Sequence, residues 1–315
     1  MRKKDKQDIF WFSLCSIAVP LAGFAGLLYV AYPLVGADTE NTHYDFSSPE
    51  EHSSLFLPHT GVSLVERDWS VATHDFAATA IIATHSTTGQ VLYSKNPDSV
   101  RPIASLTKLM VAIVVRENLH LYDSFEVSEA VLSAEGKKIG LQPGTSIMVR
   151  DALYALLLES GNDAAIALEE HYNERFPRFD TSSLVYDMNQ RARSFGLRTT
   201  HFVDATGISP DNISTVYEIT KLLKYASEDP ILHRIMGTAE YRYLDSEWET
   251  TNALLHNEPG IIGGKTGYTE AAGQSISLHG TVNNNEVLMV ILDARTDRIL
   301  EGARLWQWIQ QAYKW

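Results

Sequence analysis

The feature that most constrains the fold is the placement of strand-like segments at both ends of the body of the chain. Residues 79–96, "TAIIATHSTTGQVLYSKN", have the pattern of two apolar strands joined by a turn. Near the end, residues 274–282 and 286–294 have the same pattern around an Asn-rich turn. The sequence therefore predicts an α/β (α+β) fold, in which N- and C-terminal strands pair in one antiparallel sheet that is flanked by helices and interrupted by a mostly helical insert.

Helical periodicity fills the middle of the chain and its last segment. Apolar residues recur at the spacing of one helix face in residues 104–118, 149–160, 163–176, 182–196, 215–227 and 298–315. Trp306, Trp308 and Trp315 belong to the last of these segments. Large aromatic side chains pack more often than they bind ligands, so we expect them to dock this helix on the sheet.

The first 70 residues predict an exported body behind a hydrophobic segment. Residues 1–8 are basic and are expected to stay in the cytoplasm, whereas residues 9–36 are uncharged. Because roughly 20 apolar residues cross a bilayer, we expect a transmembrane anchor there. The alternative is a secretory signal that is cleaved near Ala37. Residues 37–70 are polar and indicate a flexible linker that spans about 30 Å, so we expect the folded body, residues 71–315, outside the cytoplasm and attached to the membrane.

Composition excludes several classes of function. The formal net charge is -13 at pH 7, whereas nucleic-acid binding needs an excess of Lys and Arg. The one cysteine, Cys15, lies in the apolar segment, so neither an intramolecular disulfide nor a cysteine nucleophile fits. The 11 histidines show no spacing typical of metal ligands. We therefore predict no nucleic-acid partner and no metal.

The segment "IIGGKTGYTEAAG", residues 261–273, invites two interpretations. A phosphate-binding loop needs a glycine five residues before Gly264, but that position is Pro259. The residues after Lys265-Thr266 are also poor helix formers, whereas such a loop must open a helix. A strand edge fits better: Lys265 supplies charge, Thr266 supplies a hydroxyl for a carboxylate, and Gly267 leaves room for a ligand.

Ser105-Leu106-Thr107-Lys108 has the pattern S-x-x-K at the start of a predicted helix. Residues at i and i+3 share one helix face, so Lys108 is within reach of Ser105. A serine attacks only if its proton is removed, and a lysine can accept that proton if its pKa is lowered. The helix start favours a developing oxyanion near Ser105. Alone, the pattern is equally typical of a capping serine followed by a surface lysine.

Ser160-Gly161-Asn162 has the pattern S-x-N between two helical segments. Such residues are common at helix ends and in turns, so the motif is weak by itself. Its functional interpretation makes Ser160 a proton relay near Lys108 and Asn162 a hydrogen-bond partner of the substrate amide. The order S-x-x-K, S-x-N and K-T-G, about 55 and then about 100 residues apart, carries more weight. This trio is typical of penicillin-binding proteins and class A β-lactamases.

With these motifs the chain resembles the serine D-alanyl-D-alanine carboxypeptidases, the low-molecular-mass penicillin-binding proteins. The similarity covers about residues 75 to 313 and includes "ASLTKLM", "LLLESGNDAAIALEE", "MNQRARSFGLRTTHFVDATG", "GGKTGYTEAAG" and "TDRI". It implies a DD-peptidase/β-lactamase-like fold, a DD-peptidase catalytic domain over residues 71–315, peptidoglycan stem peptides as substrates, β-lactams as covalent inhibitors and no cofactor.

The resemblance also implies roles for single residues. Ser105 would be acylated by the penultimate D-Ala carbonyl, Lys108 would accept its proton, and Ser160 and Asn162 would complete the proton network. The terminal carboxylate of the substrate would bind to Lys265 and Thr266 with help from Arg298, beside Gly267. The backbone N–H groups of Ser105 and Tyr268 would form the oxyanion hole.

Two departures from the family qualify this interpretation. The chain ends about 50 residues after K-T-G, which leaves no room for the C-terminal β-domain of many members, so we expect the N-terminal apolar segment to do the tethering. Ala205 replaces a proline that is common in the family.

Three alternative functions would use the same pocket but differ in the reaction that the protein carries out. A D,D-endopeptidase would cut peptidoglycan crosslinks with the same acyl transfer. A class A-like β-lactamase would need a deacylating glutamate, and none occurs between Glu174 and Glu218. An inactive wall-binding or β-lactam-sensing module would keep the pocket without turnover.

Overall fold

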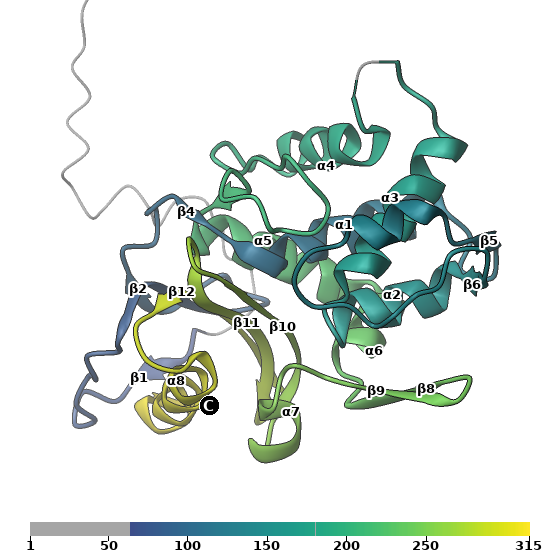
Figure 1. Cartoon of the computed structure of the whole chain (residues 1–315). Helices are drawn as coiled ribbons and strands as arrows, with labels where there is room; N and C mark the ends of the chain where they lie inside the picture. The colour runs from purple at the N-terminus through teal and green to yellow at the C-terminus, as the bar shows by residue number, and fades with distance from the viewer. Residues whose placement is uncertain (1–63, 180) are drawn as a thin grey trace, which may run out of the picture. The chain divides into compact units, whose positions relative to one another are not determined.

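The centre of the fold is a five-stranded antiparallel sheet with the strand order β10-β11-β12-β2-β3 (Figure 1). The computed structural model describes residues 64–179 and 181–315. The sheet consists of β2 (Ala78–His85), β3 (Val91–Lys95), β10 (Ile261–Thr269), β11 (Gly273–Val282) and β12 (Asn285–Ala294). β2 pairs with β12. The predicted pairing of N- and C-terminal strands is therefore confirmed.

Alternating residues of the sheet face two separate cores. In β2, Ile81 and Ala83 pack in the cluster that contains Trp306, whereas Ala80 and Ile82 pack with the helical insert. This follows from the two-residue period of a strand, which sends neighbouring side chains to opposite faces. Figure 1 shows helix α8 (Arg298–Ala312) on one side of the sheet and α5 (Val216–Glu228) with the rest of the insert on the other.

The predicted helical insert is confirmed, with two short helices that the sequence did not indicate. It comprises α1 (Thr107–Asn118), α2 (Val149–Leu157), α3 (Asn162–Arg175), α4 (Ser183–Ser194), α5 (Val216–Glu228) and α6 (Pro230–Met236), and the short helix α7 (Leu254–Asn257) follows it. The 3-10 helices η2 (Ala104–Leu106) and η3 (Glu129–Ser133) precede α1 and α2. We did not predict α6 or α7.

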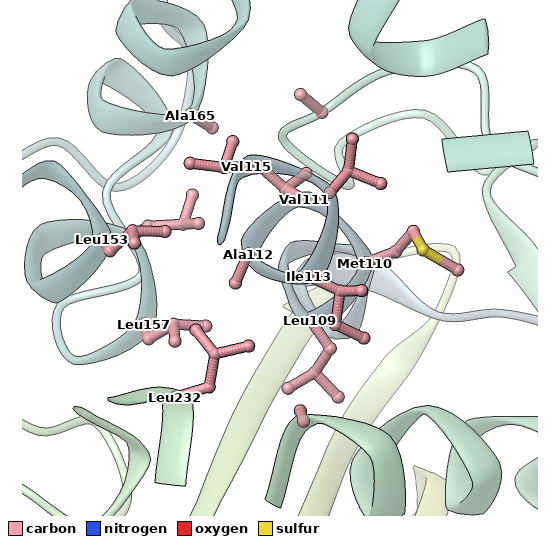
Figure 2. Close-up of a cluster of buried hydrophobic side chains, with 14 of the residues drawn as sticks. Leu109, Met110, Val111, Ala112, Ile113, Val115, Leu153, Leu157, Ala165 and Leu232 are labelled. Atoms are coloured by element: carbon pink, nitrogen blue, oxygen red, sulfur yellow. The ribbon is translucent and has the colours of Figure 1, made fainter. Parts of the chain in front are cut away.

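Helix α1 lies at the middle of the insert. Its residues from Thr107 to Val115 are all buried, and a helix that is buried on all sides needs apolar residues on every face. Figure 2 shows why: side chains of α2, α3 and α6, among them Leu153, Ala165 and Leu232, point toward α1 from different directions. This packing holds the start of α1, and with it Ser105, against movement.

Four small two-stranded sheets complete the described fold: β1 (Glu66–Arg67) with β13 (Tyr313–Lys314), β4 (Arg101–Pro102) with β7 (Ile213–Ser214), β5 (Ser124–Glu126) with β6 (Ser146–Met148), and β8 (Glu240–Tyr243) with β9 (Ser246–Glu249). The pair β1–β13 corrects two expectations. Residues 66–67 belong to the folded body and not to the linker, and the last helix stops at Ala312 because the chain then extends to pair with β1.

Helix α8 is docked by its tryptophans, as predicted. Trp306 is fully buried, and its indole Nε1 donates to Pro259 O at 3.0 Å. The Trp308 indole donates to Ala72 O at 2.8 Å and lies against the guanidinium of Arg67, 4.9 Å from the ring centroid. Trp315 lies beyond the helix and packs on the same core. The segment that precedes β2 is thus held on α8.

The N-terminal predictions concern residues that the structure does not describe. The anchor or signal of residues 9–36 and most of the linker lie outside the described ranges. Within residues 64–179 and 181–315, no helix is both long and apolar enough to cross a membrane. All described residues belong to one compact unit.

Candidate active site

Ser105 lies in a tight turn between β4 and α1. The residue before it, Ala104, has φ 48, a left-handed conformation that is unfavourable for a residue with a Cβ atom. Ser105 then occupies the middle of η2, directly before the first turn of α1. Strained backbone of this kind persists only where surrounding structure holds it, and it is typical of functional positions.

Gly207 provides the space for this turn. Its φ is +82, and a Cβ atom at this position would lie 2.1 Å from the Ala104 carbonyl oxygen and 3.0 Å from Ser105 N. No real Cβ atom approaches a backbone atom that closely. Glycine is therefore required here both by the backbone conformation and by the contact with Ala104.

Lys108 is fully buried and donates three hydrogen bonds. Its Nζ donates to Ser105 Oγ at 3.0 Å, to Asn162 Oδ1 at 2.7 Å and to the carbonyl oxygen of Thr206. An ammonium group has three protons, so these acceptors use all of them. When the lysine is neutral, two protons can remain on Asn162 and Thr206, which leaves the lone pair directed at Ser105 Oγ.

The environment of Lys108 favours the neutral form. Burial lowers the pKa of its ammonium group to about 7, while the carboxylates of Asp204 and Asp163 act in the opposite direction. All three acceptors of the amine are neutral groups, so none compensates fully for the lost hydration. A lysine with this pKa can accept the proton of Ser105 Oγ near neutral pH.

Asp204 shapes the loop that carries Thr206. Its Oδ1 accepts from Thr206 Oγ1 at 2.8 Å and from Gly207 N at 2.6 Å, and its Oδ2 accepts from Ser209 N at 3.0 Å and from Asn212 Nδ2 at 2.8 Å. Burial raises the pKa of Asp204, but these hydrogen bonds more than offset it, so the pKa is lowered overall. The ionised carboxylate fixes the carbonyl of Thr206 beside Lys108.

The S-x-N motif lies between α2 and α3, on the other side of Lys108. Ser160 has φ 61 and is 8% exposed, and Asn162 is the first residue of α3. The Asn162 side chain accepts from Lys108 and donates through Nδ2 to Glu135 O at 2.6 Å. Ser160 lies two residues before Asn162 in this turn, and no hydrogen bond joins it to Lys108 in the described part of the chain.

A loop over residues 135–141 is held against the start of α3. The buried carboxylate of Asp163 accepts from the backbone N–H groups of Ile139, Gly140 and Leu141, at 3.0, 2.8 and 3.0 Å. The backbone N–H of Asn162 donates to Lys137 O at 2.8 Å. Asn162 and Asp163, at the start of α3, therefore hold both Lys108 and this loop. Asp163 is a positioning residue that sequence reasoning missed.

The K-T-G residues lie inside β10, an edge strand of the sheet. The strand expected in residues 261–273 is confirmed for Ile261–Thr269, which is extended and paired with β11 at the edge of the sheet. That this edge binds a carboxylate stays a prediction. A Cβ atom on Gly267 would lie 3.2 Å from Ser105 N, so the strand passes directly beside the serine. Gly267 therefore leaves room for this close approach. The motif occupies the middle of this strand.

Lys265 and Thr266 are buried on this strand. Lys265 Nζ donates to Thr266 O at 2.9 Å, and Thr266 Oγ1 lies 2.6 Å from the hydroxyl of Thr251. Burial lowers the pKa of Lys265 well below its ordinary value, and the positive charges of Lys108, Arg298 and Lys137 lower it further. A bound carboxylate would stabilise the charge on Lys265.

Tyr268 lies near the end of β10, and Arg298, the first residue of α8, lies close to it through Gln274. The Arg298 guanidinium donates to Gln274 Oε1 at 3.1 Å, and Gln274 pairs with Tyr268 across the strands. Arg298 Nε has no hydrogen-bond partner among the described residues, and burial lowers the pKa of the group. The Tyr268 side chain is 59% exposed. Arg298 is thus a partly satisfied cation at the edge of the site.

Positively charged groups lie near Lys265 in a chain of formal net charge -13. Arg298 and Lys137 both act on the charge of Lys265, and Lys137 is paired with Glu159 at 2.5 Å. Local positive potential attracts an anionic ligand group. Among the described residues, no group of three or more His, Cys, Asp or Glu side chains is arranged to hold a metal ion. The arrangement is suited to acyl transfer from a ligand that carries a carboxylate.

Comparisons with known proteins agree with this chemistry. Residues 67–296 match the sequence family Peptidase S11, D-alanyl-D-alanine carboxypeptidase. A D-alanyl-D-alanine endopeptidase of Pseudomonas aeruginosa is 33% identical over 249 residues, which are 75% of this chain and 78% of that protein. The D-alanyl-D-alanine carboxypeptidase DacF of Bacillus subtilis is 31% identical over 227 residues, which are 67% of this chain and 56% of that protein.

A solved structure extends the similarity to the fold. The crystal structure of the Streptomyces K15 DD-transpeptidase is similar with a TM-score of 0.71 at 28% sequence identity, over 76% of this chain and 99% of that one. The fold that we expected from the sequence is therefore confirmed.

Proposed function

The chain belongs to the D-alanyl-D-alanine carboxypeptidase family, Peptidase S11, and on this premise we propose that it cleaves the D-Ala-D-Ala ends of peptidoglycan stem peptides through an acyl-enzyme on Ser105. One observation carries the proposal. The buried amine of Lys108 lies 3.0 Å from Ser105 Oγ and 2.7 Å from Asn162 Oδ1 of the second motif, and the strand of the third motif passes beside Ser105 N. The partner is an extracytoplasmic peptide, and no cofactor is needed.

Acylation follows from the position of Lys108. Ser105 Oγ attacks the carbonyl carbon of the penultimate D-Ala, and its proton moves to the neutral amine of Lys108. The C–N bond then breaks, and the departing amine takes up a proton that returns from Lys108. The products of this step are an ester on Ser105 and free D-alanine.

Deacylation reverses the proton path. Water attacks the ester carbonyl, gives its proton to Lys108, and the ester C–O bond breaks to release the shortened peptide. Ser105 Oγ recovers the proton from Lys108. The backbone N–H groups of Ser105 and Tyr268 would stabilise the oxyanion of both steps.

The cationic edge of the site accounts for specificity toward a free carboxylate. Lys265 supplies charge, Thr266 a hydroxyl and Arg298 a guanidinium with an unused Nε proton among the described contacts. A substrate amide or ester would leave these buried donors without a charged acceptor, which is costly. Peptides that end in a carboxylate are therefore the favoured class.

Mass spectrometry of the intact protein tests the proposal. Benzylpenicillin should add its full mass to Ser105, because opening of the β-lactam ring leaves no departing group. Ser105→Ala should give no adduct while retaining its fold. An adduct that persists in Ser105→Ala, or wild-type protein that neither binds penicillin nor releases D-alanine from an acyl-D-Ala-D-Ala peptide, would contradict the proposal and leave a non-catalytic wall-binding or sensing module.

The penicilloyl ester should be long-lived. No glutamate occurs between Glu174 and Glu218, where a class A β-lactamase would carry its deacylating base. Steady-state hydrolysis of a penicillin at a high rate would instead identify the chain as a β-lactamase.

Endopeptidase activity is the second candidate, and the relative from Pseudomonas aeruginosa, named an endopeptidase, favours it. The same acyl transfer would cut D-Ala–diaminopimelate crosslinks. Purified protein should be incubated in parallel with pentapeptide and with crosslinked muropeptides, and the products resolved by mass. Faster loss of the crosslinked dimer than of terminal D-Ala would assign the endopeptidase role.

We also propose that the body works outside the cytoplasm, held at the membrane by residues 9–36. The apolar composition of that segment and the wall substrate support this location. N-terminal sequencing of the membrane-fraction protein would test it: a mature chain beginning near residue 38 would mean cleavage after Ala37.

A further inference from the structure

The hydroxyl of Thr251, which lies outside the three motifs, directly contacts Thr266 of the K-T-G motif. It lies in the connection between β9 and α7, and its Oγ1 is 2.6 Å from Thr266 Oγ1. Thr266 is 3% exposed, so this hydroxyl has few other partners available. The contact joins two residues that are 15 positions apart in sequence.

The backbone around Thr251 is fixed to the second motif. Thr251 N donates to Leu158 O at 3.0 Å, and Glu249 N donates to the Glu159 carboxylate at 2.9 Å. Leu158 and Glu159 directly precede Ser160. Thr251 is therefore held between the S-x-N turn and the K-T-G strand, and its hydroxyl has little freedom to leave Thr266.

The direction of this hydrogen bond decides what Thr266 can do. Each hydroxyl has one proton and two lone pairs. If Thr266 donated to Thr251, it would present only lone pairs to a ligand carboxylate, and the two would repel. If Thr251 donates, Thr266 keeps its proton for the ligand, and the bond that it accepts makes its own O–H a stronger donor.

We propose that Thr251 is a positioning residue that orients the Thr266 hydroxyl as a donor to the substrate's terminal carboxylate. The inference rests on the proposed function, because it concerns the group that this site binds. At the end of the site that binds the carboxylate, Thr266 would then act together with Thr251 and not alone. Thr251 would act through Thr266 and not on the reacting atoms.

Activated thioesters test the proposal, because they acylate serine enzymes with or without a carboxylate. The pair is an N-acyl-D-alanyl-thioglycolate, which carries the carboxylate on its leaving group, and the methyl ester of the same compound. Thr251→Val keeps the shape of the side chain and removes the hydroxyl. We expect this variant to lower kcat/KM for the acid by about five- to tenfold, mainly through a higher KM. For the methyl ester, kcat/KM should stay within about twofold of the wild-type value.

Two further variants separate orientation from general damage. Thr251→Ser restores the hydroxyl and should recover the rate with the acid. Thr250→Val changes the neighbouring residue, whose hydroxyl accepts from Asn252 N at 3.2 Å and does not contact Thr266, and should leave both rates unchanged.

The outcomes also distinguish this inference from the proposed function. An equal loss on both thioesters, or no loss on either, would overturn the role of Thr251 while leaving the acyl-enzyme in place. Wild-type protein that cleaves neither thioester and forms no penicillin adduct would instead overturn the proposed function.

Discussion

The amine of Lys108 and the amide oxygen of Asn162 are joined by a hydrogen bond of 2.7 Å that connects the first motif to the second. Asn162 thereby directs one lysine proton away from Ser105, as the carbonyl of Thr206 does for another. The third hydrogen-bonding direction of Lys108 Nζ faces Ser105 Oγ. The two acceptors thus set the direction of the lone pair as well as the position of the lysine.

The rate of acylation should depend on pH through Lys108. Its pKa is about 7, below the ordinary 10.5, because the group is buried. Only the neutral amine can accept a proton, so the neutral fraction and the rate rise as pH increases through about 7 and level off above it. Stopped-flow measurement of benzylpenicillin acylation between pH 5 and 9 checks this, and a rate that falls over that range would contradict it.

Lys108→Arg should remove the base without removing the positive charge. Arginine stays protonated over the whole accessible pH range, so acylation should fall by about 10²- to 10⁴-fold and should not recover at high pH. Circular dichroism serves as the control for folding. Retention of a pH-dependent rate in this variant would mean that another group accepts the proton.

Asn162→Asp should move the pH profile upward. A carboxylate at 2.7 Å from Nζ favours the charged lysine, and an opposite charge at such distances typically raises the pKa of a lysine by about one unit or more. The acylation rate at pH 7 should therefore fall by about fivefold or more and recover partly above pH 8. An unchanged apparent pKa would show that Lys108 is not the titrating base.

Asp204→Asn should have the opposite effect on the same profile. The Asp204 carboxylate acts to raise the pKa of Lys108, so neutralising it should lower the apparent pKa of acylation. The variant also loses an acceptor for Ser209 N and Asn212 Nδ2, and we expect a loss of about 1–3 kcal/mol in the free energy of unfolding. Urea unfolding measures the second effect, and an upward shift in apparent pKa would contradict the first.

Gly207→Ala should displace the serine. The new Cβ would lie 2.1 Å from Ala104 O, which carries the backbone into Ser105. Gly196→Ala is a matched control, because Gly196 has φ +69 but nothing within 4 Å of its Cβ position. The control should lose about 1 kcal/mol of stability from backbone conformation alone and keep full acylation, whereas Gly207→Ala should lose acylation as well. Equal activities would mean that the turn around Ala104 adapts.

The chemistry of the site was largely predictable from the order of three short motifs. Lys108 contacts both Ser105 and Asn162, and β10, the strand that carries Lys265 and Thr266, passes beside Ser105. Local periodicity also predicted the strands of the sheet. Neighbouring residues of a strand, such as Ile81 and Ile82, point to opposite faces whatever the strand packs against. The roles of these residues stay predictions until the variants above are measured.

Long-range contacts were not predictable in the same way. Nothing in the residues around Thr251, Asp163 or Gly207 indicates what each of them touches, because their partners lie elsewhere in the chain. The boundary of the body was also placed too late, since the short β1 is stabilised by pairing with β13 at the other end of the chain.

The sequence by itself determined which reactive groups the protein carries and which segments alternate or repeat as strands and helices, because those properties depend on residue type and local spacing. Tertiary structure decided whether Lys108 is a base, since the pKa of an amine depends on the water and charges that folding removes or brings near. It also decided that Asn162 faces the lysine and that Thr251 faces Thr266. These properties arise only when segments distant in sequence pack together.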